Sequence, residues 1–548
     1  MTAQPAVRPR TAGGPGDDPR GAGFGGLLRA EWVKFRSVRG WPIGMLLAAA
    51  LMVFIGVFAA ANASIACGIP GGPTRTGRAC LPPDIARGPG GEVVSDSFSF
   101  LHRTLTGNGS ITARVTGLTG RHADLAGGRA RAGSGPDMVP GLAPWAKAGI
   151  ILKQSTKPGS AYAAMMTTGD HGVRMQYNFT GDVAGMPGSV SAGRPRWLRL
   201  TRSGDTVTGY DSADGAHWTR VATVRLTGLP ATIQVGLFAT SPNYFVTQDS
   251  FGGTNVDGGP AQATGVFDRI SLTGAAGGGW AGTAVGGGGP GSGGGPGSGP
   301  NGPAFRRAGG AVTITGSGDI APVTPGPGSG FPTVTIEQSL AGAFLGLIMI
   351  VVVAAMFVTA EYRRGLIRTT LAAHPRRGDV LAAKAIVVGG AAFVTGLIAA
   401  WISIAFGVPR EENQGLLLLT VPGTTEARVI IGTAATLAVA AVFAVALGAI
   451  LRRGAAAITA AVAAVVLPFL LAALKMVPAS VGDWLLRLTP AAGLAIQQSI
   501  PRYRQVASAL DPVRGYWPLS PYAGFAVLCL WAAAALGLAL VLLRRRDA

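Results

Sequence analysis

Residue types that support hydrolysis are scarce in this chain of 548 residues. A nucleotide-binding P-loop has the pattern G-x-x-x-x-G-K-[ST], in which backbone amides and the lysine hold the phosphates. The chain has only six lysines, and none of them follows a glycine. It therefore cannot hydrolyse ATP by this chemistry, and we expect it to bind no cofactor of its own.

Carboxylates give no better support for an enzyme. Glycosidases use two carboxylates, usually including Glu, held roughly 5–9.5 Å apart. The central part of the chain has no Glu between Glu92 and Glu337. Its aspartates lie where turns commonly use this residue: Asp170, Asp205, Asp211 and Asp214. We expect neither catalytic residues nor a metal site.

A few polar and aromatic residues could instead bind a ligand. A sugar cleft could be lined by Trp145, His171, Tyr177 and Asn178. Aromatic residues of β-sandwiches are more often buried in the core, so this glycan contact competes with a purely structural role.

The composition indicates a membrane protein with a folded polar part. Charged residues make up only 13% of the chain, and the mean hydropathy is +0.38. Six stretches without Asp, Glu, Lys or Arg each contain about 20 apolar residues, the length of a membrane-spanning helix. They lie at residues 43–61, 340–360, 385–406, 429–451, 455–474 and 523–543. The first is expected to be an uncleaved anchor, because its apolar core is longer than that of a signal peptide.

Lys and Arg are concentrated on one side of this predicted topology. Cytoplasmic loops carry an excess of these residues, and the excess lies before the first span, at 361–379, at 452–453 and after the last span. Both termini are therefore expected in the cytoplasm, and residues 62–335 outside the cell. The pI near 11.0 then reflects topology rather than nucleic-acid binding. Outside the cell Cys67 and Cys80 could form a disulfide.

The outer segment is expected to form a β-sandwich. Residues 110–115 and 197–202 alternate polar and apolar side chains, and Asp214-Gly215 is typical of a hairpin. Further strands are expected at 148–153, 161–167, 172–178, 206–211, 218–225, 232–239, 265–272 and 311–315. The predicted domains are a disordered cytoplasmic tail (1–23), an interfacial helix with the first span (24–62), the extracytoplasmic sandwich (63–273), a Gly/Pro-rich linker with a short strand (274–335) and spans two to six (336–548).

Four motifs of this segment are WAKAGIILKQS at 145–155, HGVR at 171–174, WLRLTR at 197–202 and DGAHWT at 214–219. They resemble the concanavalin-A-like and laminin-G-like jelly rolls of bacterial surface proteins. The resemblance covers about residues 93–274 and implies a jelly-roll fold, which in some of these proteins binds glycans.

The membrane part contains GGLLRAEWVKFRSVRGW at 25–41, TAEYRRGLIRTTLAAHPRRGDVLAAK at 359–384 and DWLLRLTPAAGLAIQQS at 483–499. These segments resemble the permease subunit of actinobacterial ABC-2-type transporters. The resemblance implies a separate ATPase subunit that binds ATP, a second permease copy or sibling, and short re-entrant helices within 478–522. It also implies a coupling loop against the ATPase, formed by Glu361, Tyr362, Arg363, Arg364, Arg368, Thr369, Arg376 and Arg377. Without the resemblance, the same charges would indicate a solvated cytoplasmic loop.

Further local patterns complete the prediction for the helices. Residues 24–38 predict an amphipathic helix in the inner interface, with a stripe of apolar residues that Glu31 and Arg39 interrupt. The alternative is a basic flank that only fixes the orientation of the first span. Glu361 and Lys384 lie at span ends, where long side chains can reach the interface. The spans are otherwise almost free of charge, which disfavours an ion-driven transporter. Gly342 and Gly346 form a GxxxG element that permits close helix contact.

The sequence therefore predicts an α-helical integral membrane protein with six transmembrane helices and an all-β jelly-roll sandwich inserted between helices 1 and 2. Its expected function is that of an ABC-2-type permease in the plasma membrane, an exporter of unidentified cargo. The alternative is a membrane-anchored surface receptor whose sandwich binds glycan without transport.

Overall fold

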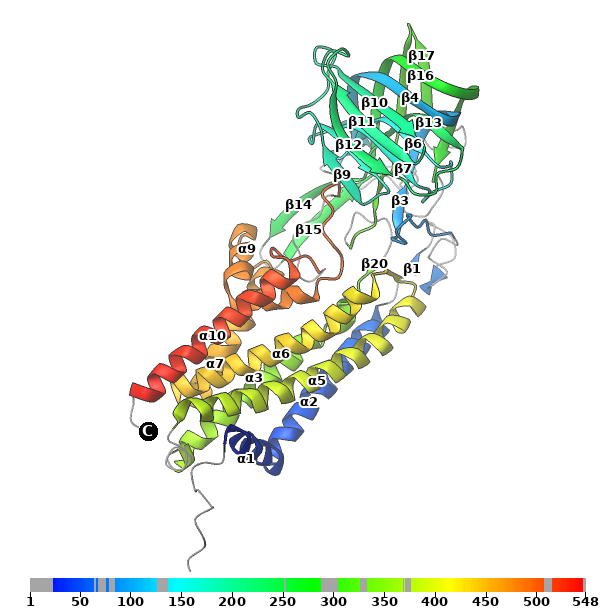
Figure 1. Ribbon diagram of the computed structural model, residues 1–548. Helices are drawn as coiled ribbons and strands as arrows, with labels where there is room; N and C mark the ends of the chain where they lie inside the picture. Colours follow the sequence, from blue (N-terminus) through cyan, green and yellow to red (C-terminus); the bar gives the residue numbers. More distant parts are fainter. Residues whose placement is uncertain are drawn as a thin grey trace, which may run out of the picture.

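The computed structural model describes residues 23–63, 66–67, 75–77, 84–125, 137–250, 253–286, 304–325, 333–367, 369, 376–506 and 515–545. A β-sandwich is stacked on one end of a bundle of apolar helices (Figure 1). Helix α1 (Phe24–Ser37) and the last turn of α10 (Pro521–Arg545) lie at the opposite end. We call these two ends of the bundle the sandwich end and the α1 end.

Within the described residues, six helical segments are long and apolar enough to cross a membrane, which confirms the predicted spans. The segments are α2 (Gly40–Asn62), η3 with α3 (Gln338–Leu340, Ala343–Arg363), α5 (Arg377–Asn413), α6 (Gly423–Leu451), α7 with α8 (Gly454–Val465, Leu467–Ala473) and α10 (Pro521–Arg545). Small residues dominate the contact surfaces, so that the backbones approach closely. Helices α3 and α6 are the most buried of the six.

Between α8 and α10 the chain forms two short helices at the sandwich end, α9 (Ala479–Leu488) and η4 (Pro490–Gln497). Most of η4 is buried, although it is a 3₁₀ helix. Arg428 of α6 anchors it, because the guanidinium donates to the carbonyl oxygens of Ile496 at 2.8 Å and Gln498 at 2.7 Å. Whether this region dips into a leaflet of the bilayer stays a prediction.

The GxxxG element lies in the contact between α2 and α3. A Cβ on Gly342 would collide with the backbone oxygen of Met52, and one on Gly346 would lie 3.3 Å from the Met52 Cβ. We expect Gly342→Val to lower the free energy of unfolding by about 1–3 kcal/mol, as overpacked cores do. Gly390→Val is the matched control, because nothing lies within 4 Å of the added Cβ. Thermal unfolding of the detergent-solubilised protein should separate the two variants; equal stability would contradict this packing argument.

Two long strands organise the sandwich, β4 (Phe98–Ala123) and β16 (Ala261–Val285), which pair antiparallel along most of their length. The first half of β4 also pairs with β13 (Thr232–Thr240), and its second half with β10 (Arg196–Ser203). All these strands belong to one 13-stranded sheet. β4 and β16 run through both layers of the sandwich, and we call these layers its two sheets. One sheet continues from β13 through β6 (Lys147–Lys153), β7 (Tyr162–Thr168), β8 (Val173–Tyr177) and β9 (Gly181–Ala184). The other continues from β10 through β11 (Thr206–Ser212) and β12 (Thr219–Arg225).

Alternating side chains of both sheets fill the sandwich core, with Ile111 and Leu200 from one sheet and Ile150 and Val235 from the other. Each strand expected from the sequence has a counterpart in these sheets. Asp214-Gly215 forms the predicted turn between β11 and β12, and Gly215 has a φ of +80°, which glycine adopts without steric cost.

The sandwich extends further along the chain than its predicted end at residue 273. β16 continues to Val285, and β17 (Ala304–Ala308) and β18 (Ala311–Gly316) join the same sheet. The stretch 274–285 was expected to be linker because it is rich in glycine. It forms a strand because the backbone of β4 pairs with it. The glycines show no alternation of polar and apolar side chains, so this pairing could not be predicted from the sequence.

The remaining strands are short or stand apart. They are β1 (Ala66–Cys67) with β2 (Arg75–Thr76), β5 (Met138–Pro140) on β4, and the hairpin β14 (Tyr244–Ser250) with β15 (Gly253–Gly259). The chain enters and leaves the sandwich through β3 (Val94–Asp96) and β19 (Ile320–Pro322), which pair with each other. β20 (Thr333–Val334) pairs with β21 (Leu417–Leu418), in the connection between α5 and α6.

An apolar joint connects the sandwich to the helix bundle. It consists of Val93, Val323, Leu417, Leu419 and Ile500. They come from the residues directly before β3 and after β19, the α5–α6 connection and the segment after η4. Two buried ion pairs tie the entry and exit strands to β6, Lys153 with Asp96 at 2.7 Å and Lys147 with Asp319 at 2.5 Å. The sandwich is therefore held against the bundle by the packing of the apolar joint, in addition to its two covalent connections.

Candidate functional site

The buried face of α1 contains a charge at its centre. Leu27, Glu31 and Phe35 are the buried residues of this helix and lie four positions apart, on one face. Leu27 packs with Val380 and Ala383 of α5. Glu31 was expected to interrupt the apolar stripe; it is instead buried within it, because a cation from α5 meets it there.

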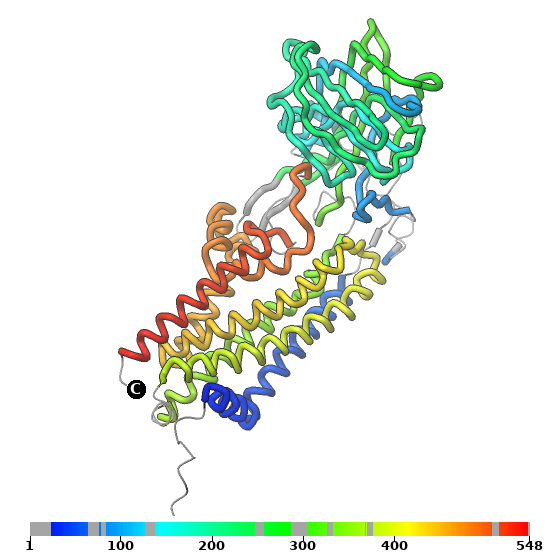
Figure 2. The backbone as a smooth tube through the Cα atoms, viewed as in Figure 1, coloured from blue at the N-terminus to red at the C-terminus, as the bar shows by residue number. Residues whose placement is uncertain are grey.

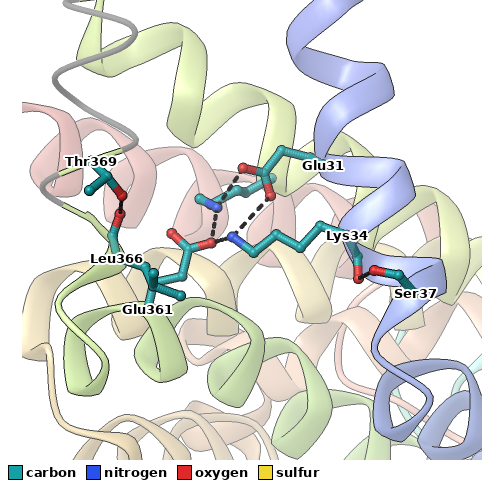
Figure 3. A network of polar contacts seen from close by, with 7 residues as sticks. Glu31, Lys34, Ser37, Glu361, Leu366 and Thr369 are labelled. Atoms are coloured by element: carbon teal, nitrogen blue, oxygen red, sulfur yellow. Dashed lines mark hydrogen bonds and ion pairs between the residues drawn. The ribbon is translucent and has the colours of Figure 1, made fainter.

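That cation is Lys384, whose ammonium joins carboxylates from two other helices. Figure 3 shows Glu31, Glu361 and Lys34 of this site close together. The Lys384 Nζ donates to Glu31 Oε1 of α1 at 2.7 Å and to Glu361 Oε1 of α3 at 2.5 Å. Lys34, one turn after Glu31, adds an ion pair with Glu361 and lies 3.9 Å from Glu31 Oε2. We call these four residues the ion network.

The ion network is shielded from solvent. The side chains of Lys384, Glu361 and Glu31 are 2%, 3% and 5% exposed, and that of Lys34 is 31% exposed. The ring of Phe357 lies beside both ammonium groups, with its centroid 5.4 Å from Lys384 and 5.7 Å from Lys34. The prediction that Glu361 and Lys384 extend to the interface is therefore wrong, since each finds its counterion inside the bundle.

Two carboxylates and two ammonium groups make the network formally neutral. Burial of a charge is costly unless the charge is paired and hydrogen-bonded. The network therefore connects α1, α3 and α5 strongly in one geometry, and removal of a single member would leave a buried charge uncompensated. This arrangement can transmit a displacement of α1 to the membrane helices. It offers no group arranged for covalent catalysis, and no set of metal-binding side chains occurs in the described residues.

Lys34 should give the network a measurable pH dependence. Burial and the neighbouring Lys384 lower the pKa of Lys34 from 10.5 to about 8. Between these values the unfolded chain binds more protons than the folded one, so stability should rise as the pH increases from 8 to about 10.5. We expect this rise to be smaller in Lys34→Met. Thermal unfolding at pH 8, 9 and 10 tests it, and identical profiles of the two proteins would contradict it.

The predicted coupling loop divides into an internal and an exposed part. Glu361 belongs to the ion network, and the Tyr362 ring packs on Arg452 with 5.4 Å between ring centroid and guanidinium. Arg377 donates to the carbonyl of Leu543 and thereby caps the last turn of α10.

The exposed part contains Arg363, Arg364, Thr369 and Arg376. The Thr369 hydroxyl donates to the carbonyl of Leu366 at 2.8 Å, and Arg368 lies outside the described residues. The structure thus leaves three arginines of the predicted loop available on the surface of the α1 end.

The four residues considered for glycan contact do not form one group. Trp145 is 6% exposed and stacks on His171 with 3.8 Å between ring centroids, beside the turn that precedes β8. Tyr177 and Asn178 lie at the other end of β8. The Asn178 side chain accepts a hydrogen bond from the amide of Tyr162 at 3.3 Å. A glycan ligand stays a prediction. The predicted disulfide cannot be placed, since Cys80 and the side chain of Cys67 lie outside the described residues.

Sequence reasoning missed Glu31, Lys34 and Lys384 as a site. One signal was present: Lys384 is the only charge between Asp379 and Arg410, and Glu31 lies between Leu27 and Phe35 at helical spacing. A charged residue on each of two otherwise apolar helices suggests that the two charges form an ion pair. The neighbouring sequence, however, does not show which residue is the partner.

Comparison with known proteins places the chain in a family. The family model described as ABC-2 family transporter protein matches residues 183–548, which is more than half of the chain and includes all helices from α3 to α10. No curated protein gives a significant match.

Solved structures give only faint likenesses. A functionally unknown protein from Saccharomyces cerevisiae is 18% identical, with 35% of this chain and 82% of that chain covered at a TM-score of 0.21. Scytalido-glutamic peptidase with a transition state analog inhibitor is 8% identical, with 40% and 98% covered at a TM-score of 0.22. TM-scores this low support no argument about fold or function. The family match does, and the chain belongs to the ABC-2 family of transporter proteins.

Proposed function

We propose that the chain is the membrane-spanning permease subunit of an ATP-driven exporter in the plasma membrane, with its ATPase on a separate chain. The observation that carries this proposal is the family match, which covers five of the six apolar helical segments. The missing P-loop agrees with it, because a transporter without a nucleotide site in this chain needs a motor from elsewhere.

The α1 end is the surface on which we place the ATPase. Arg363, Arg364 and Arg376 are exposed there, next to the ion network that connects α1, α3 and α5. A partner with an acidic cleft would be attracted to these charges. Movement of that partner against the loop would then reach α1 and α5 through Glu361 and Lys384.

We place the α1 end in the cytoplasm and the sandwich outside the cell. Support comes from the distribution of exposed arginines, since cytoplasmic ends of membrane proteins are rich in Lys and Arg. Exposed arginines at the α1 end are Arg29, Arg36, Arg39, Arg363, Arg364, Arg376, Arg453, Arg544 and Arg545.

In the chain the sandwich lies between α2 and α3, so we describe it as an insertion in the first outer loop. Its two sheets agree with a jelly roll.

A second permease copy is part of the proposal, because a transport path between two subunits needs both. The helices α2, α5 and α10 expose apolar side chains on the outside of the bundle, among them Phe54, Trp401 and Leu530. Such faces contact either lipid or a second copy.

Purification from native membranes in mild detergent tests the proposed function. We expect an ATPase with a P-loop to co-purify in stoichiometric amount, and the complex to hydrolyse ATP. Repeated isolation of the intact chain without any such ATPase would overturn the proposal.

A further inference from the structure

The sheet that contains β10, β11 and β12 has a polar outer face, on the side away from the sandwich core. In β10 the inward residues Leu198 and Leu200 are buried, and Arg199 between them points outward. Strand pairing puts Arg199 opposite Tyr210 of β11, and Tyr210 opposite Arg220 of β12. The sandwich that carries these strands lies in the upper part of Figure 2, remote from the α1 end.

We call this outer surface, which carries Arg199, Arg220 and Arg225, the arginine face. Arg199 is held there by two neighbours: its guanidinium lies 3.8 Å from the ring centroid of Trp218, and its Nε donates to the Thr112 hydroxyl at 3.1 Å. Neither contact uses the terminal Nη atoms. A guanidinium that is already fixed can donate two parallel hydrogen bonds to a carboxylate with little further loss of rotamer freedom.

Neighbouring acids do not balance the charge of this face. Asp268 on β16 pairs with Arg114 of β4, whose Nε donates to it at 2.7 Å. In the turn after β11, Asp214 pairs with His217 at 2.7 Å. Asp205, in the turn after β10, accepts a hydrogen bond at 3.3 Å from the backbone that follows β12. Within the described residues, none of the three arginines of the face forms an ion pair.

Hydroxyl groups occupy the space between the arginines. They form a row across β4, β10, β11 and β12, at register positions that lie opposite one another: Ser110, Thr201, Thr208 and Thr223. The hydroxyls of Thr208 and Thr223 are 3.1 Å apart. Arg225 lies two residues beyond Thr223, so the row separates it from Arg199 and Arg220. Each hydroxyl can both donate and accept a hydrogen bond, and the face therefore offers partners for acids and for alcohols together.

We propose that the arginine face binds an acidic polysaccharide, with carboxylates of its uronic acids at the arginines and sugar hydroxyls at the hydroxyl row. Charge complementarity selects an anionic partner, and the hydroxyl row selects one that carries alcohols beside its acids. The site lies on the other sheet from Tyr177, so it is separate from the residues considered above for glycan contact. It goes beyond the proposed transport function and does not depend on it.

Titration calorimetry of the full chain in nanodiscs of neutral lipid tests the ligand class. The probes are polygalacturonate, neutral dextran and polyphosphate, all at physiological ionic strength. We expect polygalacturonate to bind at least about tenfold more tightly than either other polymer, because it alone matches both the arginines and the hydroxyl row. Absence of polygalacturonate binding, or equally tight binding of dextran or polyphosphate, would overturn the proposal.

Two double variants locate the site on the molecule. Arg199→Gln with Arg220→Gln should weaken polygalacturonate binding at least about tenfold. Arg306→Gln with Arg307→Gln removes the same charge at exposed positions of β17, which β18, β16 and β4 separate from β10. This control should stay within about twofold of the parent, because exposed charges at that distance are largely screened. Equal losses in the two variants would place the polymer elsewhere and contradict the site.

A single variant tests the geometry of the guanidinium separately from its charge. Arg199→Lys keeps the positive charge but cannot donate the two parallel hydrogen bonds, so it should lose at least about fivefold in affinity for polygalacturonate. Since Arg199 lies on the outer face, thermal unfolding of this variant should match the parent. Unchanged affinity in Arg199→Lys would show that charge alone attracts the polymer, which contradicts the assigned carboxylate contact.

Discussion

Lys384→Met should lower the free energy of unfolding by about 3–5 kcal/mol, the usual cost of removing one partner from a buried ion pair. The ammonium of Lys384 is the only group that hydrogen-bonds to both Glu31 and Glu361 in the described structure. Without it two carboxylates face each other in a site from which water is largely excluded. Lys34 cannot replace it fully, because its side chain is partly exposed.

A neutral network provides the matched control. The double variant Glu31→Gln, Lys384→Met removes one carboxylate together with the cation and leaves the ion pair of Lys34 with Glu361, so it should recover most of the lost stability. Thermal or chemical unfolding in nanodiscs measures both variants. A Lys384→Met protein as stable as wild type, or a double variant less stable than the single one, would show that the charges do not act as a unit.

The second prediction with a large effect concerns the affinity of the permease for its ATPase. Arg363→Glu with Arg364→Glu should weaken the association at least tenfold, because both side chains are exposed on the coupling loop and would repel an acidic cleft. Stability of the isolated permease should change little, since exposed substitutions have small effects.

The control for this prediction makes the same change in net charge at another place. Arg544→Glu with Arg545→Glu alters two exposed arginines at the same end of the bundle, but on α10 rather than on the loop. It should leave the affinity for the ATPase within about threefold of the parent. Quantitative co-purification of the two double variants distinguishes a docking loop from a general effect of positive charge; equal losses would contradict the coupling role.

The bundle and the sandwich were predictable because their signals are local. A run of about 20 apolar residues specifies a spanning helix wherever it occurs, and alternation in residues such as 197–202 specifies a strand with one buried face. The Gly-rich end of β16 was missed for the same reason: glycine has no side chain to alternate, so only the paired β4 backbone makes it a strand.

The candidate site could not be predicted, because its determinants lie far apart in the chain. Whether Glu361 reaches water or a counterion depends on Lys384 and Lys34, which are placed by the packing of α5 and α1. The roles of the arginines in the coupling loop could not be predicted from the sequence for the same reason. Its arginines look equivalent in the sequence, yet Arg377 caps α10 while Arg363 and Arg364 remain exposed.

The distant contacts also imply an order of assembly during synthesis. β3 to β19 contain all the paired strands of the sandwich, so this domain can fold before α3 has left the ribosome. Glu31 must wait for Lys384, which is 353 positions later, before α1 has its counterion. Gln505 meets Phe179 across 326 positions and closes last. A nascent chain thus carries Glu31 through most of its membrane insertion with only Lys34 of the same helix close to it.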